Sequence, residues 1–99
     1  MPQTSGATRQ RQQTDTPKRY HVYLHNDDFT TMEMVVKILV EVFFKSNEEA
    51  ITLMLQVHNS DKAIAGTYVY DIAASKIHKA MGMARTEGYP LQLSMEPEQ

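Results

Sequence analysis

Apolar side chains in the first half of the chain follow two different spacings. Residues 20–25, YHVYLH, combine tyrosine, valine and leucine, which predicts one extended strand. After a short polar turn, apolar residues recur three and four positions apart, as on the buried stripe of a helix: Met32, Val35, Val36, Leu39 and Phe43. Thr30 and Glu33 have the spacing of a capping box, so we expect the helix to begin at Thr30.

A second helix is predicted by the same two signals. Ser46 and Glu49 repeat the capping spacing. The apolar residues that follow share one helical face: Ala50, Leu53, Met54 and Val57. We expect this helix to end near residues 58–61.

The remaining chain predicts strand, helix and strand. Residues 62–70 are β-prone and contain Gly66, which favours a bend or bulge. Asp71 can open a third helix, and Gly88 provides its left-handed exit. The apolar stripe of this helix is Ala73, Ile77, Ala80 and Ala84. Residues 91–95, LQLSM, alternate as in a final strand.

These elements predict the fold class. Their order is β-α-α-β-α-β, which is typical of a small antiparallel sheet packed on one side by helices. We therefore expect an α+β domain over residues 18–96, with a three-stranded antiparallel sheet and three helices.

Residues 1–17 differ from this domain in composition. They are rich in Gln and Thr and nearly lack apolar side chains, so they cannot offset the entropy of ordering a backbone, and we expect a disordered extension. Residues 1–19 carry four basic side chains and one acidic one, a charge of +3, whereas the other 80 carry six and eleven, a charge of −5. The acidic body argues against nucleic-acid binding, which needs clustered cations. The basic tail is the one feature that favours a ribosome- or nucleic-acid-associated module.

Length and cysteine content narrow the classes further. A chain of 99 residues encloses one core but no deep separate active-site cleft. It has no cysteine, which excludes disulfides, thiolate metal sites and cysteine nucleophiles. It also lacks both the apolar run of roughly 20 residues that spans a membrane and the apolar core of a signal peptide. We expect a cytoplasmic protein without a membrane contact.

The segment HNDDFTTMEMV, residues 25–35, places two carboxylates and an amide directly before an apolar helix. A small hydrolase would pair one aspartate with a histidine: Asp27 or Asp28 with His21, His25 or His58. The chain contains no Gly-rich phosphate loop, no H-E-x-x-H and no G-x-S-x-G. Adjacent aspartates before a helix more often form a solvated turn that complements the helix N-terminus, so the hydrolase is the weaker hypothesis.

A metal site is the second hypothesis for the histidines. His21 and His25 have the even spacing that shares one face of a strand, with Asp27 as a further ligand. No fourth ligand is apparent, and surface histidines are the simpler interpretation. His58 ends a helical face that it shares with Met54 and Val57; the two apolar residues suit a core, and the histidine suits a carbonyl cap.

Three segments, HNDDFTTMEMV, TLMLQVHNSDKAIAG and YPLQLSMEPEQ, together resemble the ClpS family. These adaptors hand N-degron substrates to a ClpA- or ClpC-type AAA+ unfoldase and its ClpP peptidase. The resemblance covers about residues 18–96 and implies three antiparallel strands with three helices. It also implies an adaptor without enzymatic activity or cofactor.

The resemblance further implies a site for a free N-terminal residue. The family's contacts to the α-amino group match Asn26, Asp27 and His58. Its pocket for the first side chain, which is Leu, Phe, Tyr or Trp, matches Asp28, Thr30, Met32, Val35, Met54, Val57 and Leu91. The family's methionine, here Met32, acts as a gate against the branched side chains of Ile and Val.

Delivery is the other property that the resemblance implies. The family's unfoldase contacts match Asp71 and Lys76, which are also ordinary exposed helix charges. The flexible extension that delivery requires matches residues 1–17. The expected partners are the unfoldase with ClpP and N-degron substrates, not nucleic acid or a membrane. We also expect a monomer, because an adaptor with one pocket needs no second copy of the chain. The chain departs from the family at Phe29, Thr31 and Asp61, where tyrosine, proline and glycine are usual.

Overall fold

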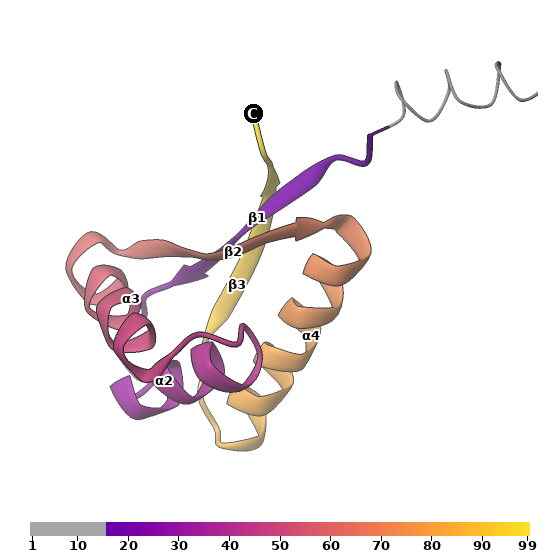
Figure 1. Ribbon diagram of the computed structural model, residues 1–99. Helices are drawn as coiled ribbons and strands as arrows, with labels where there is room; N and C mark the ends of the chain where they lie inside the picture. Colours follow the sequence, from indigo (N-terminus) through magenta and orange to yellow (C-terminus); the bar gives the residue numbers. More distant parts are fainter. Residues whose placement is uncertain (1–15) are drawn as a thin grey trace, which may run out of the picture.

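A computed structural model describes residues 16–99 of the chain. Its elements are β1 (Arg19–His25), α2 (Met32–Glu41), α3 (Asn47–Ser60), β2 (Lys62–Val69), α4 (Tyr70–Thr86) and β3 (Gln92–Pro97). The strands form one sheet in the order β2-β1-β3, and both pairs are antiparallel. The helices lie on one side of this sheet, with α2 between α3 and α4 (Figure 1). The predicted fold class is confirmed.

The core lies between the sheet and the helices. The β1 side chains Val22 and Leu24 face it and are fully buried, and the flanking residues of the strand are only half-buried. This alternation is the period of a strand with one covered face. From α4 the core receives small residues, Ala73, Ala80 and Ala84, which allow close packing of the helix on the sheet.

The start of α2 differs from the prediction. Its N-cap is Thr31, whose hydroxyl accepts from the Met34 N–H at 3.2 Å, so the capping box of Thr30 and Glu33 was wrong. The reason is that the Thr30 hydroxyl donates instead to Asp27, at 2.7 Å. The buried α2 residues are Met34, Val35, Ile38 and Leu39. Of the predicted stripe, Met32 is exposed, whereas Val36 packs partly against the core. The helix ends at Glu41, and Phe43 is buried beyond it.

The expected α3 is confirmed in its start, its face and its end. Ser46 and Glu49 form the capping box, with bonds of 3.1 and 3.0 Å. Ala50 and Val57 are buried, and Leu53 and Met54 pack partly against the core. Asp61 closes the helix in the left-handed conformation, at φ 78°, and its N–H donates to the Val57 carbonyl.

The bulge predicted in β2 is present. The register shifts where Val22 pairs with Gly66 but Tyr23 pairs with Ile64, so one residue of β2 is extra. At Gly66 a Cβ would lie only 2.6 Å from the Tyr68 ring, so a larger residue there would displace this ring.

The last two elements agree with the prediction except at their ends. Helix α4 begins at Tyr70, so Asp71 lies in its first turn instead of capping it. Gly88 has the left-handed conformation, at φ 83°, that the exit requires. Strand β3 runs on to Pro97, and Leu91 stands just before it.

Candidate functional site

A pocket of about 240 Å³ opens between the β1–α2 connection, the start of α2 and the last turns of α3. It is lined by Asn26, Asp27, Asp28, Thr30, Met32, Val35, Met54, Val57 and His58. The structure therefore brings together all the residues matched to the family's binding site except Leu91. The two halves of the pocket, within residues 26–35 and 54–58, are separate in the sequence, and the packing of α2 on α3 joins them.

Asp27 organises the turn at one side of the pocket. Its Oδ1 accepts from the backbone N–H groups of Phe29 and Thr30, at 2.8 and 2.7 Å, and its Oδ2 accepts from the Thr30 hydroxyl. An ionised carboxylate has about four acceptor positions, so three of them serve the turn and about one is left for a ligand. Asp27 thus presents a fixed negative charge.

The pKa of Asp27 follows from this environment. Partial burial raises the pKa. The hydrogen bonds from Thr30 and Phe29 and the positive charge of Arg85 lower it, and together they outweigh burial, so the pKa lies below the ordinary aspartate value. The carboxyl is therefore ionised at neutral pH.

Asn26 and His58 also line this pocket. The Asn26 backbone N–H donates to the Asp61 carbonyl at 2.8 Å, which fixes the end of β1 beside the end of α3. Neither the Asn26 amide nor the His58 ring forms a hydrogen bond with another group of residues 16–99. The carbonyl cap expected of His58 is thus not formed. Both side chains are exposed and available to a ligand.

The opposite wall of the pocket is apolar. Val35 and Val57 are buried and form its inner part, and Met54 is half-buried. Met32 is 47% exposed, which places it at the mouth. Methionine is flexible and polarizable, so the wall can adapt to side chains of different shape.

Leu91 does not line this pocket. It is 1% exposed, in the core, and its carbonyl accepts from the Arg85 guanidinium at 2.7 Å. The same guanidinium also bonds the Tyr89 carbonyl and acts on the Asp27 charge. Arg85 was missed by the sequence analysis, and its position in the last turn of α4 gave no signal of this connection.

The residues matched to the unfoldase contact lie outside the pocket. Asp71 is exposed in the first turn of α4. Lys76 is not an ordinary exposed charge, because its Nζ donates to the Val42 carbonyl at 2.7 Å. This Nζ also lies 4.4, 5.2 and 5.9 Å from the ring centres of Phe44, Tyr68 and Phe43. Burial, and then the charge of Lys79, lower the pKa of Lys76.

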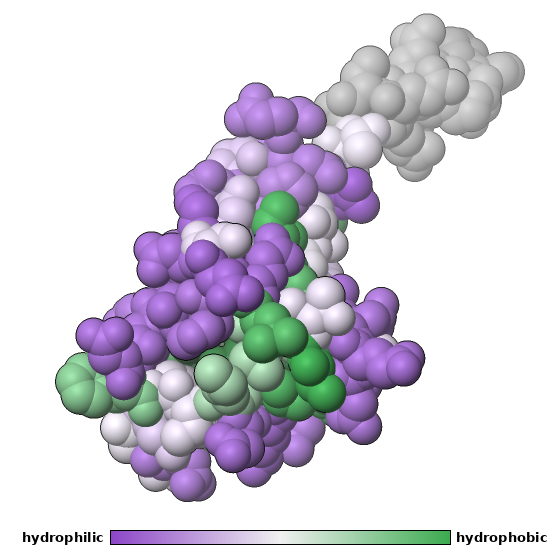
Figure 2. All heavy atoms as spheres, turned by 90° about the vertical axis from the view of Figure 1, so that its left-hand side faces the viewer, coloured by the Kyte–Doolittle hydropathy of each residue, from purple (hydrophilic) through white to green (hydrophobic). Residues whose placement is uncertain are grey.

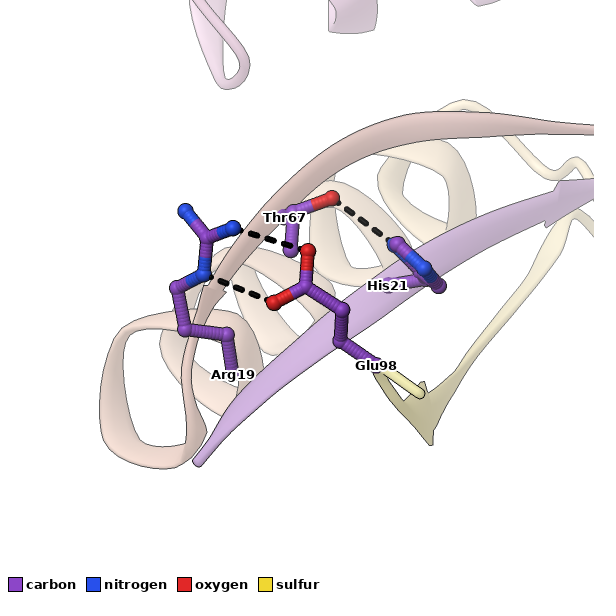
Figure 3. Close-up of polar contacts among 4 residues, drawn as sticks. All are labelled: Arg19, His21, Thr67 and Glu98. Atoms are coloured by element: carbon purple, nitrogen blue, oxygen red, sulfur yellow. Dashed lines mark hydrogen bonds and ion pairs between the residues drawn. The ribbon is translucent and has the colours of Figure 1, made fainter. Parts of the chain in front are cut away.

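His21 and His25 are engaged elsewhere on the sheet. His21 Nδ1 bonds the Thr67 hydroxyl at 2.8 Å (Figure 3), and His25 Nε2 bonds the Ser94 hydroxyl at 2.7 Å. Beside His21, Arg19 and Glu98 form a two-point ion pair. Within residues 16–99 no three His, Cys, Asp or Glu side chains are grouped so that they could hold a metal ion. Nothing in this arrangement favours the metal hypothesis.

Figure 2 views the side of the molecule on which α2 and α3 lie, where hydrophobic groups gather within a mainly hydrophilic surface. A second hollow lies beside the first half of α3 and β2. It measures about 400 Å³ and is lined by Lys45, Glu48, Glu49, Thr52, Leu53 and Ile64. It is the larger hollow, but its charges are of both signs and it contains none of the residues matched to the family's site.

Comparison with known proteins identifies the family. The family model of the ATP-dependent Clp protease adaptor protein ClpS matches residues 15–94. The chain belongs to the ClpS family. It is 53% identical over 83 residues to the ClpS adapter of Neisseria meningitidis serogroup A, covering 84% of this chain and 81% of that one. To the ClpS adapter of Desulfatibacillum aliphaticivorans it is 49% identical over 87 residues, covering 88% and 84%.

A solved structure agrees with this assignment. Agrobacterium tumefaciens ClpS2 bound to L-phenylalaninamide superimposes with a TM-score of 0.81 at 35% identity, covering 84% of this chain and all of that one. Members of the ClpS family are adaptors of the Clp protease and not enzymes. In the described part of this chain, no helix combines the length and the hydrophobicity that crossing a bilayer requires.

Proposed function

We propose that this ClpS adaptor binds proteins through a free N-terminal Leu, Phe, Tyr or Trp. It delivers them to a ClpA- or ClpC-type AAA+ unfoldase for degradation by ClpP. The observation that carries the proposal is the pocket, in which two unoccupied polar side chains and a fixed carboxylate stand beside an apolar wall.

The polar side of the pocket suits an α-ammonium group. This group has a pKa of about 7.7–8.0 and three N–H donors, so it is mostly charged at neutral pH. Asn26 offers an amide oxygen, His58 offers a ring nitrogen, and Asp27 offers its remaining acceptor position and its charge. An acetylated N-terminus lacks the charge and two of the donors, so it leaves these acceptors poorly satisfied.

The apolar side of the pocket suits one large side chain. The whole pocket has a volume of about 240 Å³, which is below the range of about 300–1,000 Å³ that holds drug-sized ligands. The bound ligand of the Agrobacterium relative is the amide of one such amino acid. Met32 at the mouth is the gate that disfavours Ile and Val, because a branched Cβ brings bulk close to it.

Delivery requires the rest of the chain. Asp71 and Lys76 are the proposed contacts to the unfoldase, and residues 1–17 are the proposed disordered extension, of which residues 1–15 lie outside the described part. The chain acts as a monomer in the cytoplasm in this proposal. The family assignment supports a Clp protease partner.

Fluorescence anisotropy with short labelled peptides tests the binding step. The peptides differ only at the first residue: free Leu, N-acetyl-Leu, free Phe, free Ile and free Ala. We expect tight binding of free Leu and Phe, and loss of binding for acetyl-Leu, Ile and Ala. Equal binding of all five peptides, or of none, would refute the proposed specificity.

A further inference from the structure

Phe44 occupies a backbone position that phenylalanine disfavours. It follows the end of α2 with φ 55°, in the left-handed region. The next residue, Lys45, donates its N–H back to the Leu39 carbonyl in the last turn of α2 at 3.0 Å. A side chain with a Cβ is strained in this conformation, and glycine is not.

The Phe44 ring is also left in solvent. It is 77% exposed, whereas the neighbouring Phe43 is 3% exposed and belongs to the core. The one aromatic or cationic contact of the Phe44 ring within residues 16–99 is Lys76, whose Nζ lies 4.4 Å from the ring centre. The fold therefore gains little from this side chain, although it bears both the backbone strain and the exposed apolar area.

The surroundings of Phe44 have the character of a docking surface. Lys76 cannot swing away freely, because its Nζ is bound to the Val42 carbonyl. Ile72, one turn earlier on the same face of α4, is 47% exposed. Lys79 adds further positive charge beside Lys76, and Lys45 directly follows Phe44 in the chain. An exposed aromatic side chain with a lysine ammonium against its ring complements a partner that has an apolar hollow with an acidic group at its edge.

The position of Phe44 separates it from the peptide pocket. Met32 at the pocket mouth begins α2, and Phe44 follows its other end. A helix of ten residues is about 15 Å long, so a peptide in the pocket leaves Phe44 uncovered. An adaptor needs two surfaces that can be occupied at once.

We propose that Phe44 is the apolar anchor of the surface on which the Clp unfoldase docks, and that Lys76 holds its ring in place. This inference rests on the proposed delivery to a ClpA- or ClpC-type unfoldase. It adds an aromatic anchor on the α2–α3 connection to the contacts matched on α4.

The test uses Phe44→Gly in the full chain. Glycine removes the ring and relieves the backbone strain, so the variant should fold at least as stably as the wild type. Binding to purified ClpA- and ClpC-type unfoldases is measured by interferometry, with peptide affinity and thermal unfolding measured in parallel. We expect the affinity for the unfoldase to fall at least about tenfold, with peptide affinity and thermal midpoint undiminished.

Two matched variants separate the ring from other effects. Within residues 16–99, Asp61 is the other residue besides Phe44 that is not glycine and has a positive φ, 78°. Asp61→Gly relieves its strain and should leave unfoldase affinity unchanged. Ile51→Ala removes a side chain that is 46% exposed on α3, and should also leave it unchanged. Wild-type unfoldase affinity in Phe44→Gly, or an equal loss of affinity in either control, would overturn the role of Phe44 but not the proposed delivery. If the wild type bound neither unfoldase, the proposed delivery would fail and the inference with it.

Discussion

The two ends of α2 are built in opposite ways. At the N-terminal end, Thr31 caps the helix and Asp27 accepts three hydrogen bonds within its own turn. At the C-terminal end, Phe44 is strained and exposed, and the Val42 carbonyl depends on Lys76 from another helix. The first end is specified by residues close in sequence, and the second by a contact between residues 34 positions apart.

This difference corresponds to the two tasks that we propose. A pocket that must hold a small charged group benefits from an acceptor fixed in advance, as Asp27 is, because a flexible acceptor loses entropy on binding. A surface that docks on a large partner can instead carry an exposed side chain that becomes buried only in the complex. The unfavourable features of Phe44 are therefore concentrated where a partner can compensate them.

The largest effect is expected from Asp27→Ala, which removes both the charge and the turn. We expect peptide affinity to fall by on the order of 1–3 kcal/mol, the range for a lost hydrogen bond to a charged group. The thermal midpoint should also fall, because the Phe29 and Thr30 N–H groups lose their acceptor. Anisotropy with a free-Leu peptide and thermal unfolding measure the two effects.

Asp27→Asn separates these contributions. Its amide oxygen can still accept from the two backbone N–H groups, but the charge is lost. We expect weak peptide binding with a smaller loss of stability than in Asp27→Ala. Undiminished peptide affinity in both variants would show that Asp27 does not serve the pocket.

At the other end of α2, Lys76→Met should destabilise the fold without affecting the peptide pocket. The Val42 carbonyl loses a charge-assisted bond, and we expect a loss of about 1–2 kcal/mol, because partial exposure of Lys76 weakens the contact. Urea unfolding measures it. Lys79→Met, an exposed lysine one turn away, should stay within about 0.5 kcal/mol of the wild type. Equal losses of unfolding free energy in the two variants would show that the bond from Lys76 to the Val42 carbonyl does not stabilise the fold.

The smallest effect is the pH dependence of the Asp27 turn. Because the folded-state pKa of Asp27 is lowered, its ionised form stabilises the fold fully above the ordinary aspartate pKa of about 3.9. This contribution is lost as the pH falls through the lowered pKa. The difference in unfolding free energy between the wild type and Asp27→Asn should therefore shrink from about pH 6 to about pH 3.

The comparison of wild type and Asp27→Asn isolates this one carboxyl. Hydrogen bonds from Ser46 also lower the pKa of Glu49, but Glu49 is the same in both proteins. A difference that stayed constant over the same pH range would show that the turn does not depend on the Asp27 charge.

Local signals in the sequence predicted most of the fold. The Ser46 and Glu49 box, the bulge at Gly66 and the exit at Gly88 were all confirmed, because each depends on residues that are close in the chain. The start of α2 was wrong by one residue, because two adjacent threonines could cap it. Only the bond between Thr30 and Asp27 decides between them.

The site was predictable in its membership but not in its bonding. Resemblance to the family brought together the residues of the β1–α2 turn and of α3, which the structure places around one pocket. It could not show that Asp27 is largely occupied by its own turn, or that Arg85 links Leu91 to this region. Nor could it show that Lys76 is bound within the fold. The first of these facts depends on side-chain geometry within one turn, and the others depend on contacts between distant segments.

One measurement tests the central claim most directly. Backbone amide chemical shifts of the labelled protein are recorded while L-phenylalaninamide, and separately its N-acetyl derivative, is added. We predict that the free amine shifts the signals of residues 26–35 and 54–58 and leaves those around Phe44 and Lys76 unchanged, and that the acetylated compound shifts none of them. Shifts centred on the hollow beside Lys45 and Glu48, or equal shifts with both compounds, would contradict the account.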